Sequence, residues 1–382
     1  MSGHFATTLI VAAGAVLALG TGFLAWSSEG RERARESLRA KVEAVEAREQ
    51  PWPGRREALW GETRPGRAFE HYQRAAGLQG WLSAWWDGAR QQVVEGREVA
   101  SAERIAGLRR GWTPALHLLQ QGAHCDDARP PAAGGDPFAG LHQALKIEVP
   151  LRFAEGRAAN AVRLWLDGLA FAVDQLAPWA WREQAVRRLL DLGSPDVVAA
   201  LGGDELDLLA QGLGRLDPLL ARMPDYEVAL AARARGLLDG TDEGVHRGYY
   251  LGAWESGFDL ETQQFDTLAE LLDLGSLLSP AAADGAARQR QWRAWASAVR
   301  RHDNWYGRWL DPLLVAIETQ QRQVLTQLRL LRLAVAFHRG GEPLELPDPF
   351  AAGMLHVQVD LGTATFRSAE TFWGCERRAV RR

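Results

Sequence analysis

Four adjacent residues that follow a helical stretch could bind a transition metal. They are His124, Cys125, Asp126 and Asp127, and imidazole, thiolate and carboxylate groups are the usual protein ligands of zinc. Neighbours on one stretch of chain rarely surround an ion without ligands from elsewhere in the sequence. We therefore interpret the cluster as part of a polar loop, residues 125–137, and predict neither a metal nor another cofactor.

A second pair of residues could carry out acid-base catalysis. His302 is followed by Asp303, and a carboxylate that orients a histidine produces a general base. His302 also lies at helical spacing in a row of mostly aromatic residues, Trp292, Trp295, Val299, Trp305, Tyr306 and Trp309. That pattern favours a packed histidine, so we assign no catalytic residue. The chain also contains no HExxH, GxSxG, GxxxxGK[ST], GxGxxG, EF-hand or paired CxxC motif.

Arginines beside the same aromatic row suggest a third chemistry. Aromatic and basic residues together can stack nucleobases or lie on a membrane surface, and the row is accompanied by Arg293, Arg300, Arg301 and Arg308. Its helical spacing favours core packing, and we predict no nucleic-acid partner. We expect most of the sixteen tryptophans, including Trp81, Trp85 and Trp86, to fill space between short helices, and some to lie at a partner surface.

Composition and cysteine content limit the class of protein. With 47% hydrophobic residues, 24% charged residues and a formal net charge of -4, the chain can bury a sizeable core and is neither disordered nor nucleic-acid-like. Cys125 and Cys375 could form a disulfide in an oxidising compartment or remain inert buried thiols. The sequence leaves both alternatives open.

An uncharged apolar segment, residues 5–26, begins almost at the initiator Met. At about 1.5 Å per residue such a helix spans roughly 30 Å of hydrocarbon, and Trp26 stands where an interfacial aromatic is expected. A cleaved signal peptide is the main alternative, but it would have a basic start and a small-residue cleavage site. We predict an uncleaved transmembrane helix that places the protein in a lipid bilayer.

The orientation of this anchor depends on the basic residues beside it. Five basic residues follow the segment, and none precedes it: Arg31, Arg33, Arg35, Arg39 and Lys41. Because basic residues stay on the cytoplasmic side of a membrane, this asymmetry favours a cytoplasmic body.

The segment after the anchor is expected to be a charged stalk helix, residues 27–50. Its acidic and basic residues alternate at helical spacing, while Leu38, Val42 and Val45 form a narrow apolar stripe that predicts a lone solvated helix. Pro51 begins a Pro/Gly-rich connector, residues 51–66.

Residues 67–340 show helical periodicity and form the predicted body. The clearest unit is a helix pair in 138–177 with a turn at Glu155 and Gly156, whose second helix has one continuous apolar face. Breaks are expected near Gly111 and Pro114. Further helices are predicted at about 179–192, 204–222, 225–238, 259–278, 281–310 and 312–338. We therefore predict an all-α fold, an irregular α-α hairpin solenoid or bundle with TPR-like pairs as one form.

The tail, residues 341–382, changes its periodicity. Val357 and Val359 are followed by Ala364 and Phe366 at period two, with a turn between the two pairs. This pattern predicts a small β-hairpin that packs on the last helix.

Three segments carry a family resemblance: WGETRPGRAFEHYQRA (60–75), LRFAEGRAANAVRLWLDGLAFAVDQL (151–176) and LRLLRLAVAFHRGGEPLELPDPF (328–350). In order and spacing they resemble a group of uncharacterised single-pass bacterial envelope proteins with an N-terminal anchor and a helical body. The resemblance implies an inner-membrane protein whose body is periplasmic. Those relatives usually carry basic residues before the anchor, which residues 1–4 lack.

Two classes of function follow from these observations. The first is a membrane-anchored helical scaffold that binds a protein partner without catalysing a reaction, because stacked helix pairs form grooved surfaces. The alternative is a hydrolase-like envelope enzyme whose site is assembled from residues distant in sequence. A buried His, Asp and Glu cluster in a pocket would favour the enzyme.

Overall fold

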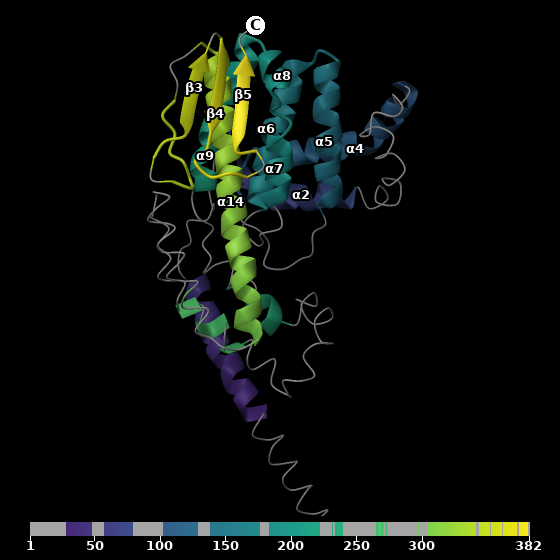
Figure 1. Ribbon diagram of the computed structural model, residues 1–382. Coiled ribbons are helices and arrows are strands. Elements are labelled where there is room, and N and C mark those ends of the chain that lie inside the picture. The colour runs from purple at the N-terminus through teal and green to yellow at the C-terminus, as the bar shows by residue number, and fades with distance from the viewer. Residues whose placement is uncertain are drawn as a thin grey trace, which may run out of the picture.

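The protein is mostly helical, with a small antiparallel sheet at its C-terminal end (Figure 1). This computed structural model describes residues 28–47, 57–78, 102–128, 138–175, 183–221, 231, 234–239, 265–266, 268–270, 272–273, 297, 305–340, 344–351, 353–360, 362–372 and 374–380. The predicted anchor, residues 5–26, lies outside them. None of the described helices combines the length and hydrophobicity that crossing a membrane requires.

The charged N-terminal segment is helical over residues 28–46, as its periodicity predicts. Its apolar stripe is at most 5% exposed and consists of Ala34, Leu38, Val42 and Val45. At its edges, Arg35 donates to the carbonyl of Leu238 at 2.9 Å, and Lys41 donates to that of Ala269 at 3.1 Å. The expectation of a lone solvated helix is therefore wrong, because the stripe is buried against the body.

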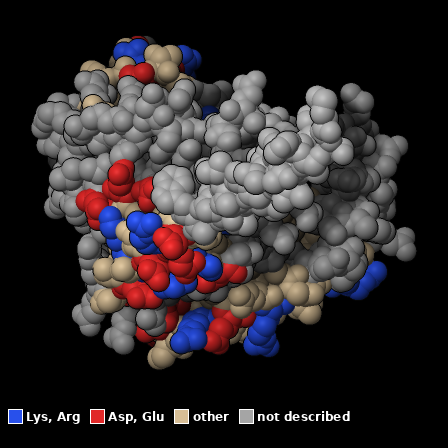
Figure 2. Space-filling model, turned by 90° about the horizontal axis from the view of Figure 1, so that it is seen from below, with Lys and Arg blue, Asp and Glu red and all other residues tan. Residues whose placement is uncertain are grey.

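This helix lies at the lower end of the molecule as drawn in Figure 1. Seen from below, acidic and basic side chains are interleaved over the described part of that face (Figure 2). Residues 28–47 contain five basic and five acidic side chains, so their charges cancel. A balanced surface of this kind gives little net attraction to a polyanion.

Two short strands lie where the sequence predicts the end of the connector and the start of the polar loop. β1 (Arg64–Arg67) pairs in parallel with β2 (Cys125–Asp127), and the Gly66 N–H donates to Asp126 at 3.0 Å. Their pairing is long-range, so periodicity within either segment does not reveal it.

Helices α2 (Ala68–Gly77) and α4 (Ala102–Ala123) pack closely because one glycine permits it. A Cβ atom at Gly122 would lie 2.5 Å from the ring of Tyr72, closer than any real contact. Buried Tyr72 in turn donates its hydroxyl to Asp174 at 2.6 Å. The break expected at Pro114 is absent, because α4 continues through it.

The central helix pair confirms the sequence prediction. α5 (Ala139–Ala154) and α6 (Ala158–Asp174) pack on each other and are joined by a turn in which Gly156 has a φ of 70°. Trp165 of α6 is fully buried and donates its indole N–H to the carbonyl of Leu189 at 2.7 Å. Burying an aromatic side chain of this size contributes about 2 to 3 kcal/mol, so α6 anchors the core.

The last helices complete the body and support the sheet. α7 (Glu183–Leu190) and α8 (Pro195–Ala199) lead into α9 (Gly203–Ala221), which packs on both α6 and α14 (Trp305–His338). α14 runs through Pro312, where the sequence predicts a boundary between two helices. A proline costs a helix one backbone hydrogen bond, and the long helix continues despite that cost.

The C-terminal sheet has three antiparallel strands rather than two. β3 (His356–Asp360) and β4 (Thr363–Arg367) form the predicted hairpin, and β5 (Glu376–Val380) adds to β4. Ala364, Phe366 and Ala379 are buried with residues of α14, as the prediction of packing on the last helix requires. β5 escapes prediction because its sequence, ERRAV, begins with charged residues and does not alternate between apolar and polar positions.

Candidate functional site

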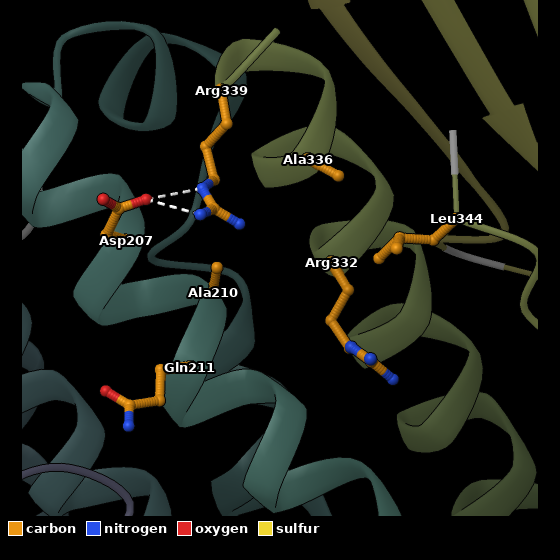
Figure 3. Close-up of a pocket in the computed structure, with 7 residues that line it drawn as sticks. All are labelled: Asp207, Ala210, Gln211, Arg332, Ala336, Arg339 and Leu344. Carbon is orange, nitrogen blue, oxygen red and sulfur yellow. Dashed lines mark hydrogen bonds and ion pairs between the residues drawn. The ribbon is translucent and has the colours of Figure 1, made fainter. Parts of the chain in front are cut away.

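A groove of about 310 Å³ lies between α9 and α14, beside the segment that leads to the sheet (Figure 3). Its lining combines small or apolar side chains with charged ones and consists of Asp207, Ala210, Gln211, Arg332, Ala336, Arg339 and Leu344. Leu344 is 39% exposed. An apolar floor with polar groups at its edges is the usual composition of a ligand-binding hollow.

Helical periodicity places these residues opposite one another. Arg332 and Ala336 lie one turn apart on α14, Arg339 directly follows the last residue of that helix, and Asp207 and Ala210 lie one turn apart on α9. Methyl side chains at Ala210 and Ala336 leave space between the two helices, which larger residues would fill. The hollow therefore exists because both helices carry alanine at facing positions.

One end of the groove carries an ion pair that is open to solvent. The Nε and Nη2 atoms of Arg339 lie 2.7 Å and 2.6 Å from the same oxygen, Oδ1 of Asp207. The side chains of Arg339 and Asp207 are 44% and 63% exposed. Figure 3 shows both contacts converging on that single oxygen. An exposed pair of this kind contributes about 0 to 1 kcal/mol to stability.

The other end of the groove is fixed by a buried ion cluster. Asp217 accepts from Arg329 through two nitrogens, at 3.2 Å and 3.1 Å, and it also pairs with Arg332. Arg329 donates as well to the carbonyl of Pro347 at 2.7 Å, which ties the segment before the sheet to α14. Across the two ends, Arg329, Arg332 and Arg339 together carry one positive charge more than Asp207 and Asp217 neutralise.

Asp207 is the one carboxylate among the seven lining residues, and Arg339 occupies it as an ion pair. Guanidinium groups donate hydrogen bonds and keep their proton, and the amide of Gln211 is neutral. An arginine at the end of an apolar floor suits a ligand that combines an apolar group with an anionic oxygen.

His124, the histidine of the predicted polar cluster, lies in a separate buried network. Its Nδ1 donates to the carbonyl of Glu62 at 3.0 Å, and its Nε2 lies 3.3 Å from Oδ1 of Asp167. Both partners are acceptors, an arrangement that favours the form of His124 in which both ring nitrogens carry a proton. The hydrogen bond to Asp167 raises the pKa of His124, and the bond to Glu62 adds to the rise, although burial opposes it.

Asp167 completes this network from the middle of α6. Its carboxylate is 2% exposed and also accepts from the Trp60 indole at 2.7 Å and from the Gln120 amide at 2.9 Å. Both ring nitrogens of His124 thus face protein acceptors, Glu62 and Asp167. The network joins residues 57–63 to α4 and α6, and the enzyme alternative gains no base from it.

The other residues of the predicted cluster point to separate partners. Asp126 accepts from the backbone of Gly66, and Cys125 donates its thiol to the carbonyl of Gln121 at 3.4 Å. Within the described ranges, no three His, Cys, Asp or Glu side chains gather closely enough to hold a metal. Cys125 and Cys375 are both free thiols, Cys125 being buried, so the structure does not join them.

The remaining candidates lie outside the description. His302, Asp303, Trp292 and Trp295 are not among the described residues, and neither are Trp81, Trp85 and Trp86. For Trp305, Tyr306 and Trp309 the backbone alone is described, as the start of α14.

Sequence reasoning missed the groove because its charged pairs are far apart in the chain. A signal was present, however. Asp217 stands at helical spacing from the buried Leu213 and Leu220 of α9. Arg329 and Arg332 likewise interrupt the leucine-rich start of LRLLRLAVAF. A charge on a buried helix face needs a partner, so two such faces of opposite charge predict a contact.

No family model matches the chain, and neither a curated protein nor a solved structure matches it.

Proposed function

We propose that the chain is a membrane-anchored α-helical scaffold of the bacterial cell envelope, and that the α9–α14 groove binds a protein partner. The observation that carries this proposal is the groove itself, with alanines on its floor, the exposed Leu344 at its side and an accessible arginine at one end. Partner-binding hollows commonly combine an apolar centre with arginine.

The anchor would hold this body close to one membrane face. The apolar run ends at Trp26, and residue 28 already belongs to a helix that is bonded to the body. Two residues of chain reach at most about 7 Å, so a bilayer around residues 5–26 leaves little freedom between membrane and body. We place the protein in the inner membrane with a periplasmic body, and a cytoplasmic body is the alternative that the flanking arginines favour.

The finer architecture belongs to the same proposal. We propose that the helices form an irregular array of α-α hairpins, of which α5 with α6 is the clearest unit. Such arrays present grooves between packed helices, as α9 and α14 do.

Crosslinking in intact cells, followed by affinity purification of the full chain, tests the partner-binding role. The wild type is compared with Ala210→Phe, which fills the groove, and with Ala40→Phe, which adds the same side chain at an exposed position of helix 28–46. We expect one discrete crosslinked partner with the wild type and Ala40→Phe, and its loss with Ala210→Phe. Recovery of no partner, or equal recovery from both variants, would contradict the proposal.

Protease access to the body in spheroplasts tests the compartment. Digestion from outside is the expected result for a periplasmic body. Protection until the membrane is opened would instead establish the cytoplasmic alternative. Release of the chain by an alkaline wash would exclude the anchor.

A further inference from the structure

The geometry points to a specific ligand for the groove: a carboxylate with an adjacent apolar side chain, bound by Arg339 in competition with Asp207. This inference rests on the proposed function and names the chemistry of the partner segment. It requires that the Asp207–Arg339 pair can open while the rest of the groove stays fixed. Three observations indicate that it can.

The first observation is how Arg339 uses its donors. Both the Nε and the Nη2 contacts go to Oδ1 of Asp207, whereas a carboxylate that approaches a guanidinium side-on accepts the two bonds with two oxygens. The paired side-on form is the stronger arrangement. A ligand carboxylate is free to orient itself, whereas the carboxylate of Asp207 is tethered to α9. The ligand can therefore make a better contact with Arg339 than Asp207 does.

The second observation is the contrast in burial along the groove. The side chain of Asp217 is 9% exposed and is held by two arginines, whereas that of Asp207 is 63% exposed and, among the described residues, pairs with Arg339 alone. Opening the buried cluster would leave a charge without its partner in the interior, but opening the exposed pair returns two charges to water. A ligand carboxylate can therefore replace Asp207 at Arg339, but it cannot replace Asp217 in the buried cluster.

The third observation is what lies between the two ends. Asp207 and Asp217 are ten residues apart on α9, or about 15 Å, and the methyl groups of Ala210 and Ala336 with the side chain of Leu344 occupy the interval. A carboxylate on Arg339 places its neighbouring side chain over this apolar floor (Figure 3). Chemically, a peptide that ends in an aliphatic residue, or that carries an acidic residue beside one, fits this arrangement.

Titration calorimetry on the full chain in detergent tests the inference with two small probes. N-acetyl-leucine carries the carboxylate and the aliphatic group, and N-acetyl-leucinamide lacks the charge. We expect the acid to bind with a dissociation constant on the order of 1 mM and the amide to bind much more weakly. Equal affinity for the two probes would overturn the inference.

Variants identify the competing residue. Asp207→Asn should tighten binding of the acid about threefold, because it removes the internal competitor, and Arg339→Gln should weaken it about tenfold. Asp204→Asn is the matched control, since it removes the same charge from an exposed position on α9 that does not line the groove. Equal affinity in Asp207→Asn and Asp204→Asn, or no binding by Asp207→Asn, would refute the role of Asp207.

The two proposals can fail separately. If Ala210→Phe abolishes crosslinking to a partner but Asp207→Asn leaves acid binding unchanged, the groove binds its partner by other contacts, and the carboxylate inference is wrong. If no partner is recovered in cells, the scaffold proposal fails even where N-acetyl-leucine binds.

Discussion

Asp167 and Asp207 each contact a basic side chain, but the two carboxylates differ in burial and in the number of their partners. Asp167 is 2% exposed and accepts from Trp60 and Gln120 as well as from His124. Asp207 is 63% exposed, and within the described part of the chain its carboxylate contacts Arg339 through one oxygen. The first network joins three parts of the fold, and the second pair lies beside a groove.

This difference separates a structural ion pair from an exchangeable one. Inside the protein, a polar group that loses its partner pays the full cost of desolvation, so a satisfied buried network resists opening. At the surface, water replaces the lost partner at little cost. Residue identity alone does not distinguish the two cases, since each consists of an acid and a base. Burial and the number of partners do.

The largest effect is expected at the buried end of the groove. Asp217→Ala leaves Arg329 and Arg332 without their common carboxylate, and it should lower the free energy of unfolding by about 3 to 5 kcal/mol. Urea unfolding of the full chain measures this effect. Asp207→Ala, which removes the exposed carboxylate from the same helix, should change stability by less than about 1 kcal/mol. Similar losses for the two variants would erase the contrast between the ends.

A smaller loss is expected in the His124 network. Asp167→Asn keeps the size of the side chain but replaces one acceptor oxygen with an NH2 group and removes the charge that His124 faces. Since hydrogen bonds to charged groups contribute about 1.5 to 3 kcal/mol, we expect a loss of about 2 kcal/mol in the same assay. A loss below about 0.5 kcal/mol would mean that Asp167 does not hold the network together.

The pH dependence of stability should show a still smaller effect. Because the folded protein raises the pKa of His124, its protonated form contributes stability fully below the pKa of the unfolded chain, about 6.5, and loses it as pH rises through the folded pKa. The stability advantage of the wild type over His124→Gln should therefore shrink as pH rises. An advantage that grows with pH would contradict a doubly protonated His124.

The sequence reveals those parts of the fold that depend on local periodicity. The apolar face of α6 and the alternation of Val357, Val359, Ala364 and Phe366 identify a helix and a hairpin because neighbours in the chain create each pattern. The prolines mislead in α4 and α14, because each helix continues through its proline despite the lost hydrogen bond. β1 and β2 are too short to show a period.

The candidate site depends on contacts that local patterns do not record. Asp207 meets Arg339 across 132 residues of sequence, and Asp217 meets Arg329 across 112. The sequence indicates His124 as a candidate metal ligand. Its role in the structure follows instead from contacts with Glu62 and Asp167, which no motif links to it. Charged residues on apolar helix faces were the available sign of such contacts.

Competition between Asp207 and a ligand for Arg339 is tested by the unfolding free energies of the wild type and Asp207→Asn, measured with and without N-acetyl-leucine. Without ligand, the two should agree within about 0.5 kcal/mol, as expected for an exposed pair. With the ligand present at several times its dissociation constant, both should gain stability, and Asp207→Asn should gain more. Equal gains, or a larger gain in the wild type, would show that Asp207 does not compete for Arg339.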